Sequence, residues 1–445
     1  MASLWLTEAL PLPVTALLPL LLFPLAHVLS VREAAAPYAS PPIFLFMGGF
    51  MVALAMEKWN LHRRIALHIL RVSGRGPLGL LAGFTIATAF LSMWISNTAT
   101  TVMMVPIALA VVHWTAEQLR PRDADRVGET VMLSIAYAAS IGGTMTLIGT
   151  PPNVLLAAFV RDQYNGTIGF LDWMVFAAPL GITMLALMLV YMWFRLPAGL
   201  GGVVRQTRIA VGESLKELGP PSRGEVIVLV VFTCMVVALV GLGTLRHYKP
   251  LVEQLPILSR LSDELIVILA AIALFAIPVD ITKNVFALDW ETAQRLPWGV
   301  LLIFGGGLSL ARAVTASGFD DWIAQSVAAW HELPDFLFVA AVTAVVVFAT
   351  ELASNTATAS AFLPILAAAA KGIGIAPESL LVPATIASSF AFMLPSGTPP
   401  NAIVFGTGTV SIQRMARVGL LLNLLAVLLV SITTRVWLPP FGLPQ

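Results

Sequence analysis

Two long apolar stretches, one with no Asp, Glu, Lys or Arg and one with a single acid, constrain this chain more than any other feature. In the first, no Asp, Glu, Lys or Arg occurs between Arg75 and Glu117, a gap of 41 residues. The triplet Ser-Asn-Thr at 96–98 lies near its middle. At about 1.5 Å per residue, the stretch is too long for one helix across a hydrocarbon core of about 30 Å. A re-entrant hairpin fits this length, provided that protein or water covers its tip. We therefore predict a hairpin over 77–116.

The same pattern returns in the second half of the chain. The stretch between Asp335 and Lys371 carries Ser-Asn-Thr at 354–356 and a single acid, Glu351. We predict a second hairpin over 334–371. An acid inside an apolar hairpin is by default a functional candidate. Because the first stretch has no acid, we favour a structural role for Glu351 and keep ion coupling or gating as the alternative.

The composition excludes a soluble protein. Only 11% of the residues are charged and 58% are apolar, whereas about a quarter are charged in soluble domains. Such a chain cannot cover a water-exposed surface, and it is too hydrophobic to be disordered. Near-continuous apolar segments without period-two alternation argue against a β-barrel. We predict an all-α polytopic protein of the cell (inner) membrane. The net charge of +1 gives no reason to expect a nucleic-acid partner.

Hydropathy predicts nine further apolar segments. They cover roughly 3–30, 41–57, 130–160, 173–194, 225–243, 264–280, 298–311, 379–410 and 418–438. In this scheme the base of the first hairpin shares a side with five loops that carry 17 of the 25 Lys and Arg residues. The positive-inside rule assigns that side to the cytoplasm.

Two five-residue motifs each occur twice, in the same order. Ser-Asn-Thr-Ala-Thr begins at 96 and at 354, and Gly-Thr-Pro-Pro-Asn begins at 149 and at 397. An odd number of predicted spans separates the two halves, so we expect them to have opposite topology. Inverted repeats with helices broken near the midplane are typical of secondary transporters.

The repeat divides the chain into transport parts and scaffold. The transport parts are 41–160, with a broken helix at 130–160, and 298–410, with a broken helix at 379–410. We assign 1–40, 161–297 and 411–445 to scaffold spans and connecting segments.

Thr-Pro-Pro-Asn inside a span must break the helix. The prolines at 151–152 have no N–H, so the carbonyls at 147–148 lose their partners. Thr150 then becomes the N-cap of a new half-helix. The second copy, at 398–400, frees the carbonyls at 395–396 in the same way. Free carbonyl oxygens suit a hard cation such as Na⁺, and a half-helix N-terminus suits an anion.

The motifs give no support to catalysis. Neither triplet has a histidine or an acid placed as a base, and the six histidines show no metal-ligand spacing. We therefore expect a protein that is not an enzyme and has no organic cofactor. We also expect that no Arg or Lys is available near these motifs. We accordingly expect helix N-termini and bound cations to balance the charge of an anionic substrate.

The doubled motifs, together with Trp-Leu-Thr-Glu-Ala-Leu-Pro-Leu-Pro-Val-Thr-Ala-Leu-Leu-Pro at 5–19, resemble the divalent anion–sodium symporter family over essentially the whole chain. The resemblance, which includes bacterial sodium/dicarboxylate symporters, implies a homodimer with a dimerising scaffold and a transport part that moves as an elevator. The segment similar to the family's third span begins at residue 3. The resemblance therefore also implies that two N-terminal spans are absent.

The resemblance further implies specific ligands. The first sodium site would comprise Ser92, Ser96, Asn97 and the carbonyl of Gly149. The second would comprise Thr350, the carbonyl of Ala353, Asn355 and the carbonyl of Gly397. Substrate carboxylates would meet Asn97, Thr98, Asn355 and Thr356, with Thr150 and Thr398 lining the same cavity.

The leading hypothesis is sodium-coupled symport of C4-type dicarboxylates such as succinate, malate and fumarate. Two tips, each with an Asn and a Thr, suit a ligand with two separated carboxylates. The alternatives are a sodium-independent dicarboxylate or anion exchanger, a sulfate or citrate carrier of the same fold, and a channel.

Overall fold

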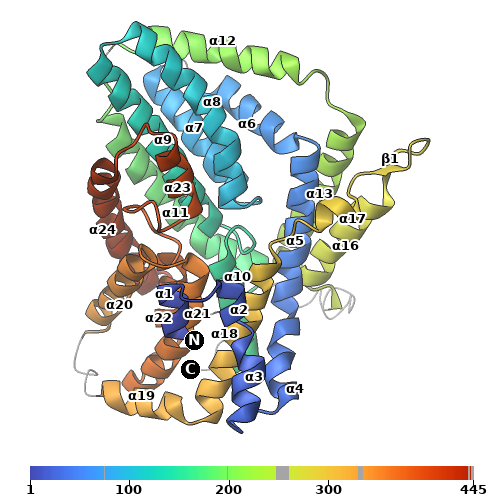
Figure 1. The fold of residues 1–445 in the computed structure, drawn as a ribbon, viewed down its shortest axis with the longest axis vertical. Coiled ribbons are helices and arrows are strands. Elements are labelled where there is room, and N and C mark those ends of the chain that lie inside the picture. Colours follow the sequence, from blue (N-terminus) through green and yellow to red (C-terminus); the bar gives the residue numbers. More distant parts are fainter. Residues whose placement is uncertain (75, 198, 247–259, 329–333, 439–440, 442–445) are drawn as a thin grey trace.

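The structure is a computed structural model. It describes residues 1–74, 76–197, 199–246, 260–328, 334–438 and 441. Helices make up most of the described chain, with one small antiparallel pair of strands. The strands are β1 (Pro278–Asp280) and β2 (Val285–Phe286). They lie at one side of the molecule (Figure 1), and the helices of the described chain confirm the expectation of an all-α protein.

In the first half of the chain, the described residues form eleven α-helices and one short 3₁₀-helix. These elements are α1 (Ala2–Thr7), α2 (Leu12–Thr15), α3 (Leu18–Leu25), α4 (Val31–Ala35), η1 (Ala36–Ala39), α5 (Pro41–Lys58), α6 (Leu61–Val72), α7 (Pro77–Ser92), α8 (Asn97–Gln118), α9 (Pro121–Thr144), α10 (Pro151–Tyr164) and α11 (Phe170–Trp193).

The second half of the described chain is also mainly helical. Its described helices are α12 (Gly201–Glu217), α13 (Arg223–Arg246), α16 (Asp263–Ala276), α17 (Trp290–Ala293), α18 (Trp298–Ala316), α19 (Phe319–Val327), α20 (Asp335–Thr350), α21 (Asn355–Ile373), α22 (Glu378–Ala387), α23 (Pro399–Gly406) and α24 (Ile412–Val436).

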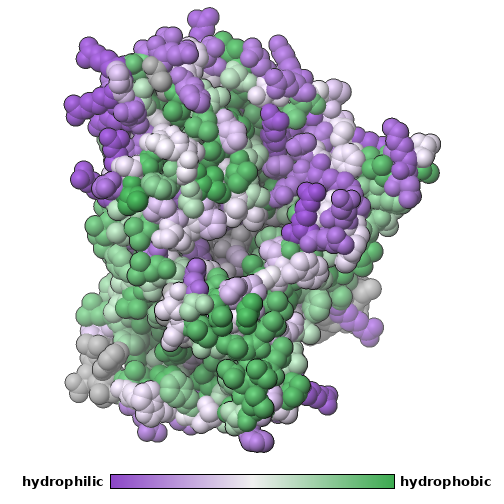
Figure 2. Space-filling view, viewed as in Figure 1, coloured by the Kyte–Doolittle hydropathy of each residue, from purple (hydrophilic) through white to green (hydrophobic). Residues whose placement is uncertain are grey.

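Seven stretches of the described chain are long and apolar enough to cross a membrane. They are Val31–Lys58, Asn97–Trp114, Phe170–Trp193, Arg223–Arg246, Trp298–Ala316, Asn355–Ile373 and Ile412–Val436. Figure 2 shows hydrophilic residues gathered at the upper end of the molecule and a largely hydrophobic face over the lower half. This distribution fits a multi-pass membrane protein.

Residues 3–30 do not form the single apolar segment that hydropathy predicts. The chain there is divided into α1, α2 and α3. Prolines cause the division, because Pro11 precedes α2 and Pro19 lies in the first turn of α3. A residue without an N–H cannot continue the helical hydrogen-bond ladder.

Each Ser-Asn-Thr triplet lies where two helices are joined by a short turn. Residues 93–96 join α7 to α8, and residues 351–354 join α20 to α21. Figure 1 places the α7–α8 pair in the upper half of the molecule and the α20–α21 pair in the lower half. The first pair packs against α9 and the second against α22.

The two breaks at Thr-Pro-Pro-Asn connect these two units. The helix that follows each break packs against the opposite unit: α10 contacts α21, and α23 contacts α8. In the first unit α9 is deeply enclosed, with every residue from Val127 to Thr144 buried. It approaches α7 so closely that a Cβ at Gly142 would collide with the backbone of Ala89. The breaks therefore bring the two helix pairs together.

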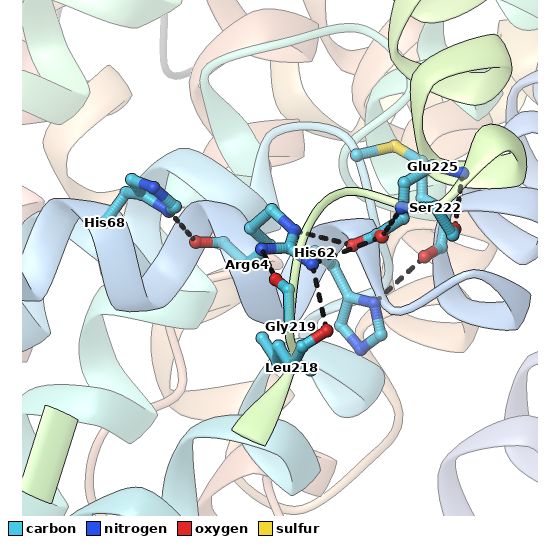
Figure 3. Close-up of polar contacts among 8 residues, drawn as sticks. His62, Arg64, His68, Leu218, Gly219, Ser222 and Glu225 are labelled. Atoms are coloured by element: carbon cyan, nitrogen blue, oxygen red, sulfur yellow. Dashed lines mark hydrogen bonds and ion pairs between the residues drawn. The ribbon is translucent and has the colours of Figure 1, made fainter. Parts of the chain in front are cut away.

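A buried ion pair joins α6 to the junction of α12 and α13 (Figure 3). The guanidinium of Arg64 donates from Nε to Oε1 of Glu225 at 2.7 Å and from Nη1 to the carbonyl of Gly219 at 3.0 Å. Glu225 also accepts from the backbone N–H of Ser222 at 2.6 Å. Because both charged side chains are largely buried, loss of one partner would leave an uncompensated charge.

Candidate functional site

A cavity of about 870 Å³ brings together both copies of each of the two repeated motifs. Its wall includes residues 96–99, 149–151, 354–356 and 395–399. The predicted substrate residues all line this cavity: Asn97, Thr98, Thr150, Asn355, Thr356 and Thr398. Three predicted sodium ligands are buried close behind the wall: Ser92, Thr350 and Ala353. The remaining ones, Ser96, Gly149 and Gly397, line the cavity.

Oxygen atoms gather around the first tip. The Ser92 hydroxyl lies 2.5 Å from Oδ1 of Asn97 and 2.7 Å from the carbonyl oxygen of Ala139. A hydroxyl has one proton to donate, so it can satisfy only one of these acceptors. The hydroxyl oxygen of Ser96 accepts a hydrogen bond from the backbone N–H of Ala99 at 3.1 Å and so caps the start of α8. A hydroxyl oxygen has two lone pairs, so one lone pair can still bind a cation.

The second tip has the same arrangement. The Thr350 hydroxyl lies 2.9 Å from Oδ1 of Asn355 and 2.7 Å from the carbonyl oxygen of Ser388. The sequence analysis did not predict the carbonyls of Ala139 and Ser388. Every residue type has a backbone carbonyl, so no side chain indicates which carbonyls will bind a ligand.

The Asn355 carboxamide can point toward this cluster with either its nitrogen or its oxygen. With its nitrogen turned inward, Nδ2 lies 3.1 Å from Ser388 O, 2.9 Å from Thr350 Oγ1 and 3.2 Å from Gly397 O, and its two protons can be donated to two of these three acceptors. With its oxygen turned inward, four oxygen atoms face one another and only one hydroxyl proton is available among them. A cation would stabilise the second orientation, because hard cations bind groups of oxygen ligands. The second cluster therefore fits a small cation such as Na⁺.

The asparagine of each Thr-Pro-Pro-Asn motif holds its break together. Nδ2 of Asn153 lies 2.8 Å from the carbonyl of Thr146 and 3.2 Å from that of Thr144. Nδ2 of Asn401 lies 3.0 Å from the carbonyl oxygens at positions 391 and 394. Both asparagines are fully buried, so they supply the donors that water cannot supply there.

These carbonyls lie earlier in the chain than those predicted. We expected free carbonyls at 147–148 and 395–396, immediately before the prolines. Regular helix already ends at Thr144 in the first break and at Ala387 in the second. The carbonyls that lose their helical partners therefore begin several residues further back.

The half-helices begin where the proline chemistry predicts. α10 starts at Pro151 with Thr150 as N-cap, and α23 starts at Pro399 with Thr398 as N-cap. Neither threonine side chain makes a capping hydrogen bond. Both threonines line the cavity, and their hydroxyls make no hydrogen bond with any residue that the structure describes. The N–H groups of the first turn of each half-helix add partial positive charge beside them.

Glu351 stabilises the second break. Its Oε1 accepts from the N–H groups of Phe392 at 2.7 Å and Met393 at 2.8 Å, and its Oε2 accepts from Leu394 at 2.9 Å. The amide of Asn423 on α24 donates to Oε1 at 2.8 Å. This geometry favours the structural role.

The asymmetry between the repeats has a physical reason. The second break leaves residues 388–398 without regular helix, whereas α9 stays helical to Thr144. The longer break frees more backbone N–H groups, and one carboxylate can accept several of them. The shorter break has no such requirement, which accounts for the absence of an acid from the first hairpin.

Charged residues also line the cavity, contrary to our expectation from the sequence. Arg295 contributes to the wall, together with Glu8 and Glu57. The expectation that no Arg or Lys lies near the motifs is therefore wrong. Arg295 is distant from every motif in the sequence, and only the folding of the segment before α18 brings it to the cavity.

Comparison with known proteins shows similarity over nearly the whole chain. The model of the family described as "Sodium:sulfate symporter transmembrane region" matches residues 1–443. The sodium-dependent dicarboxylate transporter SdcS of Staphylococcus saprophyticus is 39% identical, covering 99% of this chain and 84% of the relative. SdcS of Staphylococcus aureus (strain bovine RF122) is 40% identical, covering 98% and 84%.

Two solved structures resemble the fold at low sequence identity. The Alcanivorax borkumensis YdaH transporter has a TM-score of 0.56 at 15% identity, covering 91% of this chain and 86% of that one. Neisseria gonorrhoeae MtrF, described as illuminating a class of antimetabolite efflux pumps, has a TM-score of 0.57 at 14% identity, covering 94% and 84%. At this identity the likeness concerns the fold alone.

The role of Glu351 generates a prediction. In Glu351→Gln, an amide NH₂ replaces one acceptor and faces backbone N–H groups, so we expect the free energy of unfolding to fall by about 2 kcal/mol. The readout is the thermal unfolding temperature of the purified protein in detergent. Glu378→Gln is the matched control, since Glu378 is also buried but its Oε2 accepts no hydrogen bond from the described residues. An equal loss of stability in both variants would contradict this role.

Proposed function

The chain belongs to the sodium:sulfate symporter family, and from that premise we propose that it carries C4-type dicarboxylates across the membrane by symport with Na⁺. The family confirms the resemblance predicted from the motifs. Relatives that are 39% and 40% identical bear the name sodium-dependent dicarboxylate transporter, which supports both the cation and the class of substrate. The observation that carries the proposal is that two oxygen clusters and two half-helix N-termini meet in one cavity.

Sodium ions are the co-transported substrate in this proposal. One ion binds among Ser92, Ser96, Asn97 and the carbonyl of Gly149. The other binds among Thr350, Asn355 and the carbonyls of Ala353 and Gly397. The carbonyls of Ala139 and Ser388 complete the two clusters. The support is the surplus of oxygen acceptors over protons at each tip.

The dicarboxylate binds between the two tips. One carboxylate faces Asn97 and Thr98, and the other faces Asn355 and Thr356. The hydroxyls of Thr150 and Thr398 donate from the two half-helix N-termini, which supply partial positive charge. A cavity of about 870 Å³ accommodates a small organic anion.

Rotation of the asparagine amide couples the ion to the substrate. Without a cation, the Asn355 NH₂ points inward and donates its two protons among Ser388 O, Thr350 Oγ1 and Gly397 O. A bound Na⁺ takes the amide oxygen instead, which turns the NH₂ toward the cavity. There it donates to a substrate carboxylate. Each ligand therefore favours the orientation that the other requires, which is reciprocal coupling.

The elevator mechanism belongs to the same proposal. The parts at 41–160 and 298–410 form inverted repeats whose helix pairs are re-entrant hairpins, and they move together against the scaffold segments 1–40, 161–297 and 411–445 of a homodimer. The reciprocal packing of α10 on α21 and of α23 on α8 supports their movement as one unit.

Cysteine labelling tests this movement. We expect a cysteine at Leu78, at the start of α7, to react with a cytoplasmic thiol reagent at a rate that changes when Na⁺ and succinate are added. The exposed Cys234 must first be replaced, because it would react as well. A labelling rate that does not respond to the two ligands together would contradict the elevator.

Uptake into proteoliposomes tests the transport activity. We expect saturable uptake of labelled succinate that an inward Na⁺ gradient stimulates and a K⁺ gradient does not. Malate and fumarate should compete, whereas lactate should compete weakly because it leaves one tip unpaired. Uptake independent of Na⁺ would favour an exchanger. Displacement by sulfate or citrate alone would assign a different substrate, and a conductance that does not saturate would indicate a channel.

Substitutions at the tips separate the two roles of asparagine. Asn97→Ala and Asn355→Ala should each abolish uptake, because Ala supplies neither the ion ligand nor the donor. Asn355→Asp retains oxygen ligands but has no NH₂, so we expect Na⁺ still to raise the unfolding temperature while succinate no longer binds. Gln325→Ala, on an exposed carboxamide of α19, is the control. Normal uptake by Asn355→Asp would show that the amide does not contact the substrate.

A further inference from the structure

We propose that Arg295 forms a second anion-binding point, in a vestibule at the cytoplasmic side of the substrate cavity, which captures one carboxylate of a dicarboxylate that moves between the cavity and the cytoplasm. This inference rests on the proposed function, because it concerns the path of the same substrate.

The vestibule is a separate hollow of about 630 Å³. It adjoins the substrate cavity and has four wall residues in common with it: Leu54, Glu57, Ala99 and Arg295. Ala99 follows the first Ser-Asn-Thr triplet directly. A ligand in the vestibule is therefore one short step from the tip of the first helix pair.

A set of polar contacts holds Arg295 at this position. Lys58, at the end of α5, donates to the carbonyl of Phe286 at 3.1 Å and to Oδ2 of Asp289 at 2.7 Å. The indole of Trp59 donates to the carbonyl of Ala287 at 2.7 Å. The segment that leads into Arg295 is thus fixed to α5, whose residues Leu54 and Glu57 form the opposite part of the shared wall.

Lys58 and Arg295 both line the vestibule, and of these two cations only Lys58 is neutralised. Asp289 pairs with Lys58, whose hydrogen bond lowers the pKa of the Asp289 carboxyl to about 2. The guanidinium of Arg295 makes no hydrogen bond or salt bridge with any residue that the structure describes. Arg295 therefore has its donors available, and a guanidinium can hold a carboxylate through two parallel hydrogen bonds.

Glu57 sets the strength of this capture. Its carboxylate interacts electrostatically with Arg295 across the shared wall, so it competes with an incoming anion for the same cation. The remaining titratable side chain of the vestibule, His62, has Nδ1 3.1 Å from the carbonyl of Met56. A dicarboxylate held by Arg295 keeps its second carboxylate free to reach the tip, which a monocarboxylate cannot do.

Kinetics of succinate uptake into inside-out vesicles, which present the cytoplasmic face of the protein to the substrate, test the inference. We expect Arg295→Gln to raise KM by about tenfold with little change in maximal rate, because a hydrogen-bonded charge is lost from binding. Arg295→Lys should give an intermediate KM, since a lysine lacks the bidentate fork. Glu57→Gln should lower KM. Arg122→Gln, at an exposed arginine outside both cavities, should leave KM unchanged.

The salt dependence gives a second readout. Added choline chloride should raise the wild-type KM by screening Arg295 and should affect Arg295→Gln less. If Arg295→Gln does not purify as a monodisperse protein, Arg295→Lys and Glu57→Gln decide the question. A KM that neither variant changes overturns the inference, as does an equal rise in Arg122→Gln. Absence of succinate uptake by the wild type would instead overturn the proposed function.

Discussion

A helix broken inside a membrane must satisfy its free backbone groups without water, and the rest of this structure depends on that constraint. Asn153 and Asn401 supply donors to the freed carbonyls, and Glu351 accepts from three freed N–H groups. These buried side chains come from the half-helix after each break and from the neighbouring helix pair. The breaks therefore persist only while the surrounding helices are packed together.

The same breaks create the chemistry of the site. Each one leaves carbonyl oxygens behind a helix-pair tip and a half-helix N-terminus in front of it, so a cation and an anion have adjacent positions. At the second tip, the Asn355 amide faces acceptors on every inner side. Without a ligand this arrangement favours the orientation with the nitrogen inward, and a bound cation would favour the oxygen instead, which makes the orientation responsive to Na⁺. Structural necessity and ion coupling thus have a common origin in the proline pairs.

The sequence was sufficient to predict the parts of the site that depend on local chemistry. Prolines without an N–H predicted the half-helices beginning at Pro151 and Pro399, and the doubled motifs predicted which segments share one cavity. Contacts between distant segments could not be predicted. The carbonyls of Ala139 and Ser388 have no side-chain signature, and Arg295 reaches the cavity only because Lys58 and Trp59 fix the preceding segment. Prolines also divided residues 3–30, where mean hydropathy alone indicated a single span.

The central claim is that Na⁺ prepares the two tips to receive carboxylates. The most direct measurement is the affinity of the purified protein for succinate, determined by calorimetry in buffers that contain either Na⁺ or K⁺ at equal ionic strength. Coupling between two sites is typically about 1–3 kcal/mol. We accordingly predict binding in Na⁺ that is at least about tenfold tighter than in K⁺. Equal dissociation constants in the two buffers would contradict the account.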